Sequence, residues 1–511
     1  MSFLRLILVP FALGALAVTG FAPFGFYVVP PLALAALLLL WRHCESMGAT
    51  AGIGFAFGAG MFLAGVSWVY VSLHFYGGMA MPVAAFATLL FCAILACYPA
   101  LAGIAMWLVP GDARLKFMLL FPGLWAVSEW LRGWMFSGFP WLAMGYSQVP
   151  SSPLAGFAPL LGVFGVSLVT ATLAGGLATI ADSVLQKRAQ RKLFSRTFYF
   201  GLGTSVVLVI AGAALKAQQW TQPAPGAPIK VTLLQGNIAQ DLKWDPARAI
   251  ATLDIYMQLL DNARGGLILL PETALPLIDV DVPPEYITRL AARAVQNGGD
   301  VLYGVPEFDP SGRYYNSVKS AGSAPVQTYR KVHLVPFGDY FPLRPILGWV
   351  MTLLHIPMSD FSHGPEVQKP LQVAGQRVAV NICYEDAFGE EIIRQLPEAT
   401  LLANFTNDAW WGDTIASKQH LQIAQMRALE TGRSMLRATN TGVTAIIGPD
   451  GQVVAAAPEF KTTSLSGEVQ GRQGRTPYIF WGNAGFLLLS AIMIAIAPLS
   501  ARMRRKSREA V

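Results

Sequence analysis

Charged residues are scarce in this sequence. Only 13% of its 511 residues are Asp, Glu, Lys or Arg, and 54% are hydrophobic, whereas a soluble globular protein carries about 25% charged residues. The deficit is local, because residues 227–471 have an ordinary mixed composition while residues 1–220 and 478–499 consist largely of apolar runs. The shortage of charge therefore excludes a protein that is soluble along its whole length.

Cysteine is scarce as well. Three of the four cysteines, Cys44, Cys92 and Cys97, lie in or beside the apolar runs, so that Cys383 is alone in residues 227–471. It has no partner there for a disulfide. A lone thiol in an oxidising compartment is either buried or kept for its chemistry.

The sequence also lacks the signatures of bound metals and nucleotides. Its six histidines show no metal-ligand spacing, and neither a P-loop nor a dinucleotide fingerprint occurs. We therefore expect no metal and no cofactor.

Apolar runs of membrane-spanning length dominate both ends of the chain. A bilayer core needs about 20 apolar residues in helical form. The first run resembles a signal peptide, but six further runs follow it and its cleavage signal is poor. The sequence predicts a polytopic α-helical membrane bundle with about eight transmembrane helices, seven of them in residues 1–220. The runs lie at residues 3–20, 24–41, 50–73, 80–109, 115–135, 157–185, 198–217 and 478–499.

The basic residues predict how this bundle is oriented, because cytoplasmic loops are rich in Lys and Arg. The loop Lys187–Arg196 carries five basic residues and no acid, and the tail at residues 500–511 carries five against one Glu. These two segments account for the net charge of +7, so the basic balance requires no nucleic-acid partner. Both termini are predicted to be cytoplasmic, and residues 227–471 then lie on the opposite side of the membrane.

Residues 227–471 have the pattern of an α/β domain, in which short β-branched runs alternate with helical periodicity. In α/β sheets, functional residues gather beyond the carboxyl ends of the strands. The predicted strands are Ile229–Gln235, Leu267–Pro271, Val301–Val305, Asn316–Ala321, Arg377–Cys383, Thr400–Thr406, Met435–Thr439 and Thr444–Ile447. The predicted helices are Pro246–Ala263, Pro284–Gln296, Gly389–Leu396 and Lys418–Arg433.

Three reactive side chains, Glu272, Lys331 and Cys383, each stand at or just after the end of a short strand. Taken singly, the glutamate could cap the next segment, the lysine could be solvated, and the cysteine could be a small buried apolar residue. Together they supply a base, a cation and a thiol nucleophile, which is a complete set for covalent catalysis. A helix predicted shortly after the cysteine would also place the thiol near the positive end of a helix dipole.

In this order, each at a strand end, the Glu, Lys and Cys resemble the catalytic set of the nitrilase superfamily, which acts on carbon–nitrogen bonds through a thioester. The resemblance is closer to the apolipoprotein N-acyltransferase family, and it covers nearly the whole chain. That family has the same domain placed between spans seven and eight. It also has, in the same order, motifs similar to QGNIAQDLKWDP, PETALP, YRKVHLVPFGDYFP, NICYED, NFTNDAWWGD and MRALETGRSMLRATNTG.

The resemblance implies an αββα sandwich on the periplasmic side of a bacterial inner membrane. It implies an enzyme that takes an acyl chain from a phospholipid, usually phosphatidylethanolamine. The chain would pass to the α-amino group of the diacylglyceryl-cysteine of an apolipoprotein.

The resemblance also implies a role for each matched residue. Glu272 would be the general base, Lys331 the oxyanion and charge stabiliser, and Cys383 the nucleophile. Glu385 would orient Lys331 or assist the incoming amine. The other supporting residues would be Tyr384, Trp244 and Asp339, and Asp339 stands where the family commonly has Glu.

Some segments fit the handling of lipids. Residues 343–357, LRPILGWVMTLLHIP, are too short to span a bilayer and favour a lid in the membrane interface; the alternative is a core helix. The loop Arg132–Ser147 is rich in aromatic residues, as interface segments are. Trp410 and Trp411 either shape the mouth of a pocket or pack internally. Arg427 and Glu430 are expected to form a structural pair.

Two other functions remain open on the sequence. A membrane-tethered nitrilase-type amidohydrolase would use the same three residues with water as acceptor, although one span would suffice to anchor it. A transporter or scaffold would depend instead on intramembrane charges such as Glu129 and Asp182.

Overall fold

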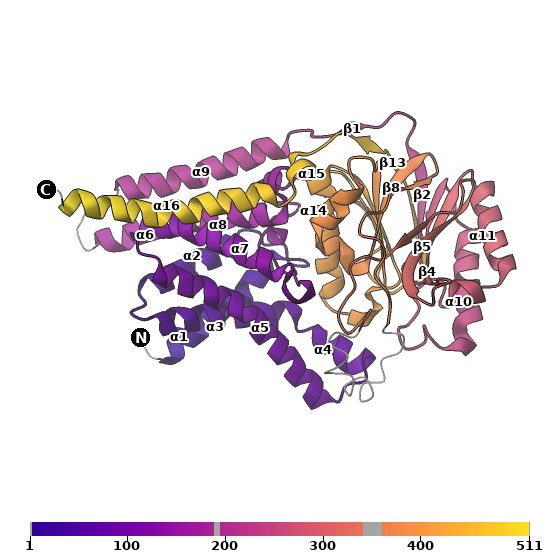
Figure 1. Ribbon diagram of the computed structural model, residues 1–511, viewed down its shortest axis with the longest axis horizontal. Coiled ribbons are helices and arrows are strands. Elements are labelled where there is room, and N and C mark those ends of the chain that lie inside the picture. The colour runs from indigo at the N-terminus through magenta and orange to yellow at the C-terminus, as the bar shows by residue number, and fades with distance from the viewer. Residues whose placement is uncertain (1–2, 189–194, 341–359, 510–511) are drawn as a thin grey trace. The chain divides into compact units, whose positions relative to one another are not determined.

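A computed structural model describes residues 3–188, 195–340 and 360–509 of the chain (Figure 1). The described chain divides into two compact units. The first comprises Met1–Ser67, Ala85–Gln218 and Phe480–Val511, and the second comprises Trp68–Ala84 and Gln219–Ile479. The predicted lid at residues 343–357 lies outside the described residues.

The first unit is helical. Gly14 in the first helix and Gly60 in the third let the two helices approach so closely that a Cβ at either position would overlap the backbone of the other helix. Such close contacts between small residues are typical of helices packed within membranes. The helices are α1 (Phe3–Ala17), α2 (Val29–Arg42), α3 (Met47–Val66), α5 (Met81–Leu108), α6 (Ala113–Leu115), α7 (Phe121–Arg132), α8 (Ala158–Arg188), α9 (Arg196–Lys216) and α16 (Ala484–Glu509).

Every predicted apolar run contains a helix, but the helices differ in length. Within the described residues, 4 segments are long and apolar enough to cross a membrane: Met47–Val66, Met81–Leu108, Pro153–Gln186 and Arg196–Lys216. The shorter apolar helices are Ile7–Gly20, Val29–Arg42 and Ala484–Pro498. These helices support a membrane protein, whereas the number of eight spans stays a prediction.

The buried charges of the helical unit have partners. Glu129 of α7 accepts the Met144 N–H at 3.0 Å, and Arg132 of α7 donates to the Trp141 carbonyl at 2.6 Å. These bonds hold part of the aromatic loop Arg132–Ser147 against α7. Asp182 of α8 pairs with Arg42 at 2.7 Å. Both acids considered for a transporter are therefore engaged in contacts that hold the helical unit together.

The second unit contains two six-stranded sheets and a small pair of strands. In the first sheet the order is β13 (Thr463–Val469), β2 (Ile229–Gln235), β3 (Leu267–Leu269), β4 (Asp300–Phe308), β5 (Tyr314–Gly322) and β6 (Thr328–Arg330). In the second sheet it is β12 (Val453–Ala456), β11 (Ala445–Ile447), β10 (Met435–Thr439), β9 (Leu401–Thr406), β8 (Gln376–Ile382) and β7 (Leu371–Val373). The strand β1 (Gln222–Pro223) pairs with β14 (Arg472–Gln473).

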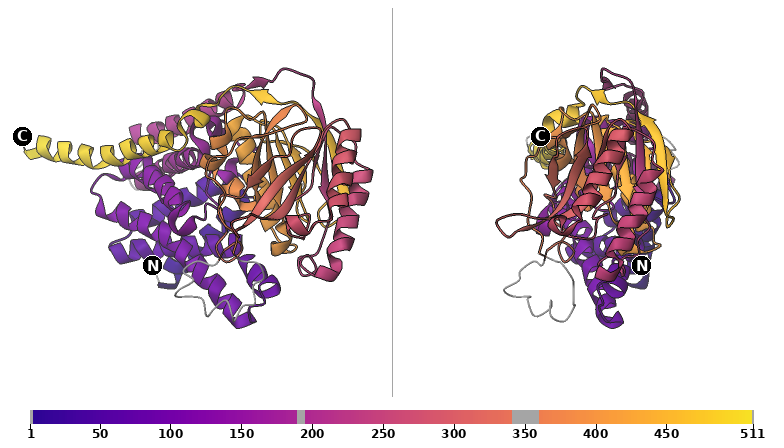
Figure 2. Two further views of the ribbon diagram at one scale, coloured as in Figure 1. Left: turned by 45° about the vertical axis from the view of Figure 1, so that its right-hand side comes forward. Right: turned by 90° about the vertical axis from the view of Figure 1, so that its right-hand side faces the viewer.

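The two sheets are stacked between two layers of helices. Successive side chains of a strand point to opposite faces of its sheet, so each sheet packs on the other sheet with one face and on helices with the other. Val231 and Leu233 of β2 and Val378 and Val380 of β8 belong to one core shared by both sheets. Leu234, which follows Leu233 and points to the opposite face of β2, belongs to a second core with α10 (Pro246–Asp261) and α11 (Pro284–Gln296). A third core packs the strands β8, β9, β10 and β11 against α13 (Gly389–Ile392) and α14 (Ala416–Thr431). The result is the αββα sandwich that the resemblance implies (Figures 1 and 2).

The central strands of both sheets end on the same side of the sandwich. β2, β3 and β4 are parallel to one another, and so are β8, β9 and β10. Just beyond β2 and β10, the Asn237 N–H donates to the Asn440 carbonyl at 2.9 Å. The carboxyl ends of the two parallel sets therefore meet, and residues that follow β3 and β8 are brought toward one region.

The segment Trp68–Ala84, which connects α3 to α5 in the chain, belongs to the second unit. It contains the short helix α4 (Val69–Val71). The Trp68 indole donates to the Gln419 side chain at 3.2 Å, and the Ser72 hydroxyl donates to the Trp410 carbonyl at 2.8 Å. The sandwich therefore contains a piece of chain from between two apolar helices.

Candidate active site

Glu272 lies just beyond β3 and is only 7% exposed. The Asn316 side chain on β5 donates a hydrogen bond to its Oε1 at 2.7 Å. A Cβ at Gly304 of β4 would overlap the Pro271 carbonyl. The backbone that carries Glu272 can therefore pack closely on β4 only because residue 304 is glycine. Glu272 is thus held as an acceptor by residues of two neighbouring strands.

Lys331 follows β6 and is 1% exposed. Its Nζ lies 2.7 Å from Asp339 Oδ2 and 3.5 Å from Glu272 Oε1. Burial disfavours its charged form, but the charges of Asp339 and Glu272 outweigh burial and raise its pKa. The Lys331 side chain therefore stays protonated between two carboxylates.

Asp339 reaches the lysine although its side chain is one methylene shorter than Glu. The turn around it brings it close: its backbone N–H donates to the Val335 carbonyl at 2.8 Å, and its Oδ2 accepts the Val335 N–H at 2.8 Å. Phe337, inside the turn, has a positive φ of 63°. The tight turn thus offsets the shorter side chain.

Cys383 is the first residue after β8 and begins the 3-10 turn Cys383–Ala387. Its φ of 54° lies in the left-handed region, which costs a residue with a Cβ roughly 1–3 kcal/mol. Its carbonyl accepts the Asn404 side-chain N–H at 3.1 Å. The expected helix dipole is missing, because the turn leads only into the four-residue helix α13.

The thiol of Cys383 is neutral at rest. Burial raises its pKa and the charge of Glu272 raises it further, whereas Lys331 and a hydrogen bond with the Thr406 side chain lower it. A thiol in this state needs a neighbouring base to become a nucleophile. Glu272 is the acid whose charge acts on it most strongly.

Glu385 connects the cysteine turn to the lysine segment. Its carboxylate accepts backbone N–H groups from Ile382 at 2.6 Å, Val332 at 2.6 Å and His333 at 3.1 Å, and the Tyr329 hydroxyl at 3.1 Å. Burial raises its pKa to about 7 against the effect of the N–H donors. Since Val332 and His333 directly follow Lys331, Glu385 holds the backbone next to the lysine.

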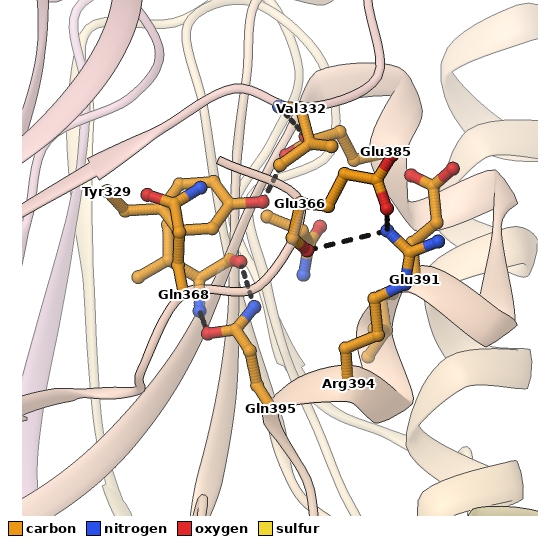
Figure 3. A pocket seen from close by; sticks show the side chains of 11 residues that line it. Tyr329, Val332, Glu366, Gln368, Glu385, Glu391, Arg394 and Gln395 are labelled. Carbon is orange, nitrogen blue, oxygen red and sulfur yellow. Dashed lines mark hydrogen bonds and ion pairs between the residues drawn. The ribbon is translucent and has the colours of Figure 1, made fainter. Parts of the chain in front are cut away.

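A small cavity lies beside Glu385 (Figure 3). Figure 3 shows Tyr329, Val332 and Gln395 around it, and Asn381 and Glu391 also line it. Its volume is about 10 Å³, which suits about one water molecule. This cavity is far too small for an acyl chain.

The two expected aromatic residues lie in different surroundings. Tyr384 is 7% exposed, and its ring packs edge-on against Phe388 with centroids 5.2 Å apart. Trp244 is half-buried just before α10. Within the described chain, no hydrogen bond or ring contact joins Trp244 to Glu272, Lys331 or Cys383.

Lys243, beside Trp244, is a site residue that the sequence analysis missed. It is 3% exposed, and its Nζ donates to the Glu272 carbonyl at 3.1 Å. Burial lowers its pKa to about 8, although the charge of Glu272 favours its charged form. The motif QGNIAQDLKWDP contained it, but an isolated lysine in a loop gives no sign that it is buried. Asn316 was missed for the same reason, as a single polar residue in a strand.

A buried ionic cluster, formed by Asp386, Asp408, His420 and Arg437, lies directly beside the cysteine turn. Arg437 contacts Asp408 at 2.9 Å and Asp386 at 3.3 Å. His420 contacts Asp386 at 2.9 Å and Asp408 at 3.0 Å. Its Nε2 also lies 3.3 Å from the Cys383 carbonyl. The sequence analysis missed this cluster, because its members are distant in the chain.

Two minor expectations can be checked here. Trp411 packs against Trp68 and His420, with ring centroids 5.3 Å and 5.1 Å apart, so internal packing is its observed role. Arg427 and Glu430 form the expected pair at 3.1 Å, fully buried within α14.

Comparison with known proteins gives consistent matches over nearly the whole chain. Residues 13–176 match the apolipoprotein N-acyltransferase N-terminal domain, and residues 230–478 match the carbon-nitrogen hydrolase family. The apolipoprotein N-acyltransferase of Nitrosomonas europaea is 49% identical, covering 97% of both chains. That of Methylococcus capsulatus is 46% identical, covering 98% of this chain and 95% of the relative. That of Ralstonia nicotianae is 44% identical, covering 96% and 92%. With a hydrolase-type sandwich, apolar helices and relatives of this identity over nearly its full length, the chain belongs to the apolipoprotein N-acyltransferase family.

Proposed function

We propose that the protein transfers an acyl chain from a phospholipid, with phosphatidylethanolamine as donor, to the α-amino group of the diacylglyceryl-cysteine of an apolipoprotein. Family membership supports lipoprotein N-acylation. The observation that carries the mechanism is the contact of Lys331 with both Glu272 and Asp339. The charge of Glu272 also raises the pKa of the Cys383 thiol, and that of Lys331 lowers it.

In the first half-reaction, Glu272 takes the proton of the Cys383 thiol as the sulfur attacks the ester carbonyl of the phospholipid. Lys331 stabilises the negative charge that develops on the carbonyl oxygen. The tetrahedral intermediate collapses to a thioester, and the lysophospholipid leaves with the proton that Glu272 returns to its oxygen. One C–O bond breaks and one C–S bond forms.

In the second half-reaction, the neutral α-amine of the apolipoprotein attacks the thioester. Glu272 accepts a proton from the nitrogen and returns it to the departing sulfur. A C–N bond forms, the C–S bond breaks, and the free thiol is restored. Glu385 positions the lysine backbone, and Tyr384 and Trp244 support the site.

The thioester is tested by intact mass. The purified protein, incubated with phosphatidylethanolamine alone, should gain the mass of one acyl chain. Neutral hydroxylamine should remove the gain, and Cys383→Ala should never acquire it. A wild-type protein that acquires no acyl mass would contradict the mechanism.

The acceptor is tested by adding a diacylated lipopeptide to the acyl-enzyme. N-acyl lipopeptide should be the main product. Free fatty acid as the main product would favour an amidohydrolase-type use of water instead. Full function in Cys383→Ser would point to a binding role without thioester chemistry.

We also propose the arrangement in the membrane. Residues 1–220 would form seven spans, residues 227–471 the periplasmic domain, residues 478–499 the eighth span and residues 500–511 a cytoplasmic tail of a bacterial inner-membrane protein. Single cysteines introduced into a cysteine-free chain test this. A cysteine at the exposed Val326 should react with an impermeant maleimide in intact spheroplasts, and one at Ser507 only after permeabilisation.

A further inference from the structure

Lys243 is a buried ammonium that the mechanism above does not use. It lies between β2 and α10, is 3% exposed, and donates to the backbone carbonyl of Glu272 at 3.1 Å. An ammonium has three N–H donors, and this carbonyl is its one hydrogen-bond acceptor among the described residues. Burying a cation for a single neutral acceptor is unfavourable. A neutral donor such as Gln would satisfy the same carbonyl, so the charge itself needs an explanation.

The balance of charge around the thiol supplies one. The centre contains two carboxylates, Glu272 and Asp339, each at most 8% exposed. Lys331 contacts both of them. With Lys331 alone, the resting centre would carry a net charge of −1, and this charge would remain in the intermediate, where the oxyanion is charged and Glu272 holds the thiol proton. With Lys243 the resting centre is neutral.

Other charges near the thiol are already compensated. Asp408, which also acts on the thiol, is bound by Arg437 and His420. Glu385 is bound by backbone N–H groups. Lys243 is therefore the cation available to balance the second carboxylate of the centre.

We propose that Lys243 is a charge-balancing residue of the acylation half-reaction: its ammonium, bonded to the backbone carbonyl of Glu272, balances the second carboxylate of the centre and offsets the charge that develops on the oxyanion. This rests on the proposed roles of Glu272 and Cys383. Lys243 transfers no proton itself. It acts through Glu272 as a positioning residue.

The proposal predicts a particular pH dependence. The acylation rate, measured without any amine acceptor, should fall above about pH 8, where Lys243 loses its charge. Lys331 stays charged there because its pKa is raised. The thiol contributes no fall at high pH, since loss of its proton creates the nucleophile.

The experiment compares Lys243→Met and Lys243→Arg with wild type, using the acyl-enzyme mass to follow the rate across pH. Lys243→Met should slow the reaction about tenfold at neutral pH and should remove the fall in rate above about pH 8. Lys243→Arg should keep most of the rate at neutral pH, because Arg stays charged, and should move the alkaline fall in rate to higher pH. Lys230→Met, at an exposed lysine of β2, is the matched control.

The outcomes separate this inference from the proposed function. If wild type forms no thioester, the proposed function fails. If wild type forms the thioester and Lys243→Met has the wild-type pH profile, the proposal for Lys243 is wrong. If both variants slow acylation equally at every pH, Lys243 has only a structural role. Should Lys243→Met fail to fold, an alkaline limb unmoved in Lys243→Arg overturns the proposal by itself.

Discussion

Cys383 stands beside two acidic neighbours, Glu385 and Asp386, and groups other than the thiol bind each of them. Backbone N–H groups surround the Glu385 carboxylate, and Arg437 and His420 contact Asp386. The acid that acts on the thiol most strongly is instead Glu272, far away in sequence. The acids of the motif NICYED therefore shape the turn, while a remote carboxylate is placed to take the proton.

Asp339→Asn should slow acylation by about ten- to a hundredfold, because Lys331 loses a charged partner that bonds to it directly at 2.7 Å. Asp339→Glu restores the charge and should retain more activity than Asn. Thioester formation measured by mass decides between them. Equal rates in Asp339→Asn and wild type would show that the contact has no part in the reaction.

Asn316→Ala should also slow acylation, because it removes the amide that holds Glu272 Oε1 at 2.7 Å. Hydrogen bonds to charged groups contribute about 1.5–3 kcal/mol, which corresponds to roughly ten- to a hundredfold in rate. Ser317→Ala, one residue along the same strand and fully buried, is the control, since its hydroxyl binds Glu307 instead. A rate that falls equally in both variants would indicate general damage to β5.

At the scale of elements, the cysteine turn is held by the ends of several segments. Asp386 comes from the turn itself, Asp408 from the segment after β9, His420 from α14 and Arg437 from β10. The cluster is formally neutral when His420 is protonated. Burial and the charge of Arg437 lower the pKa of His420, but the two aspartates outweigh them and raise it. A raised pKa means that this stabilisation is present at acidic pH and is lost as the pH rises through the folded-state value.

Arg437→Met should lower the free energy of unfolding by about 3–5 kcal/mol, because it leaves two buried aspartates with one cation. Arg289→Met, whose side chain is 57% exposed, should cost less than about 1 kcal/mol. Thermal unfolding in detergent compares the two. A similar loss of stability in both would mean that the cluster is not a buried ionic unit.

Element prediction succeeded where the pattern is local. β2, β10 and α11 have the predicted bounds, because an apolar strand or an amphipathic helix is visible within its own residues. β7 was missed because three residues are too few for a period, β12 because it is short and largely exposed, and β13 because it is largely polar. The short strand expected before Lys331 is β6. Glu272, Lys331 and Cys383 were found from their places at strand ends. Lys243, Asn316 and the ionic cluster depend on contacts between distant segments, which one sequence does not display.

At the scale of the whole molecule, the sandwich is not continuous in sequence. It includes Trp68–Ala84, a segment that the chain enters from α3 and leaves through α5. Trp68 packs on Trp411, which packs on His420 of the ionic cluster. The chain thereby connects a loop between apolar helices to the surroundings of the nucleophile.

Trp68→Ala in the full-length protein should lower the unfolding temperature of the sandwich and slow acylation, because the loss of a buried indole costs about 3 kcal/mol. Phe75→Ala is the matched control, since this ring lies in the same segment but is 67% exposed. Unfolding followed by tryptophan fluorescence and the acyl-enzyme mass give the two results. Unchanged values in Trp68→Ala would make the segment a passive connection.

The left-handed backbone at Cys383 has a consequence for how such a site persists. Glycine adopts this conformation without strain, so a chain selected for stability alone would replace the cysteine with glycine. Mutation continually supplies such stabilising changes, and only the loss of activity removes them. An unstrained glycine at this position in a relative would therefore mark a protein that has kept the fold after giving up the reaction.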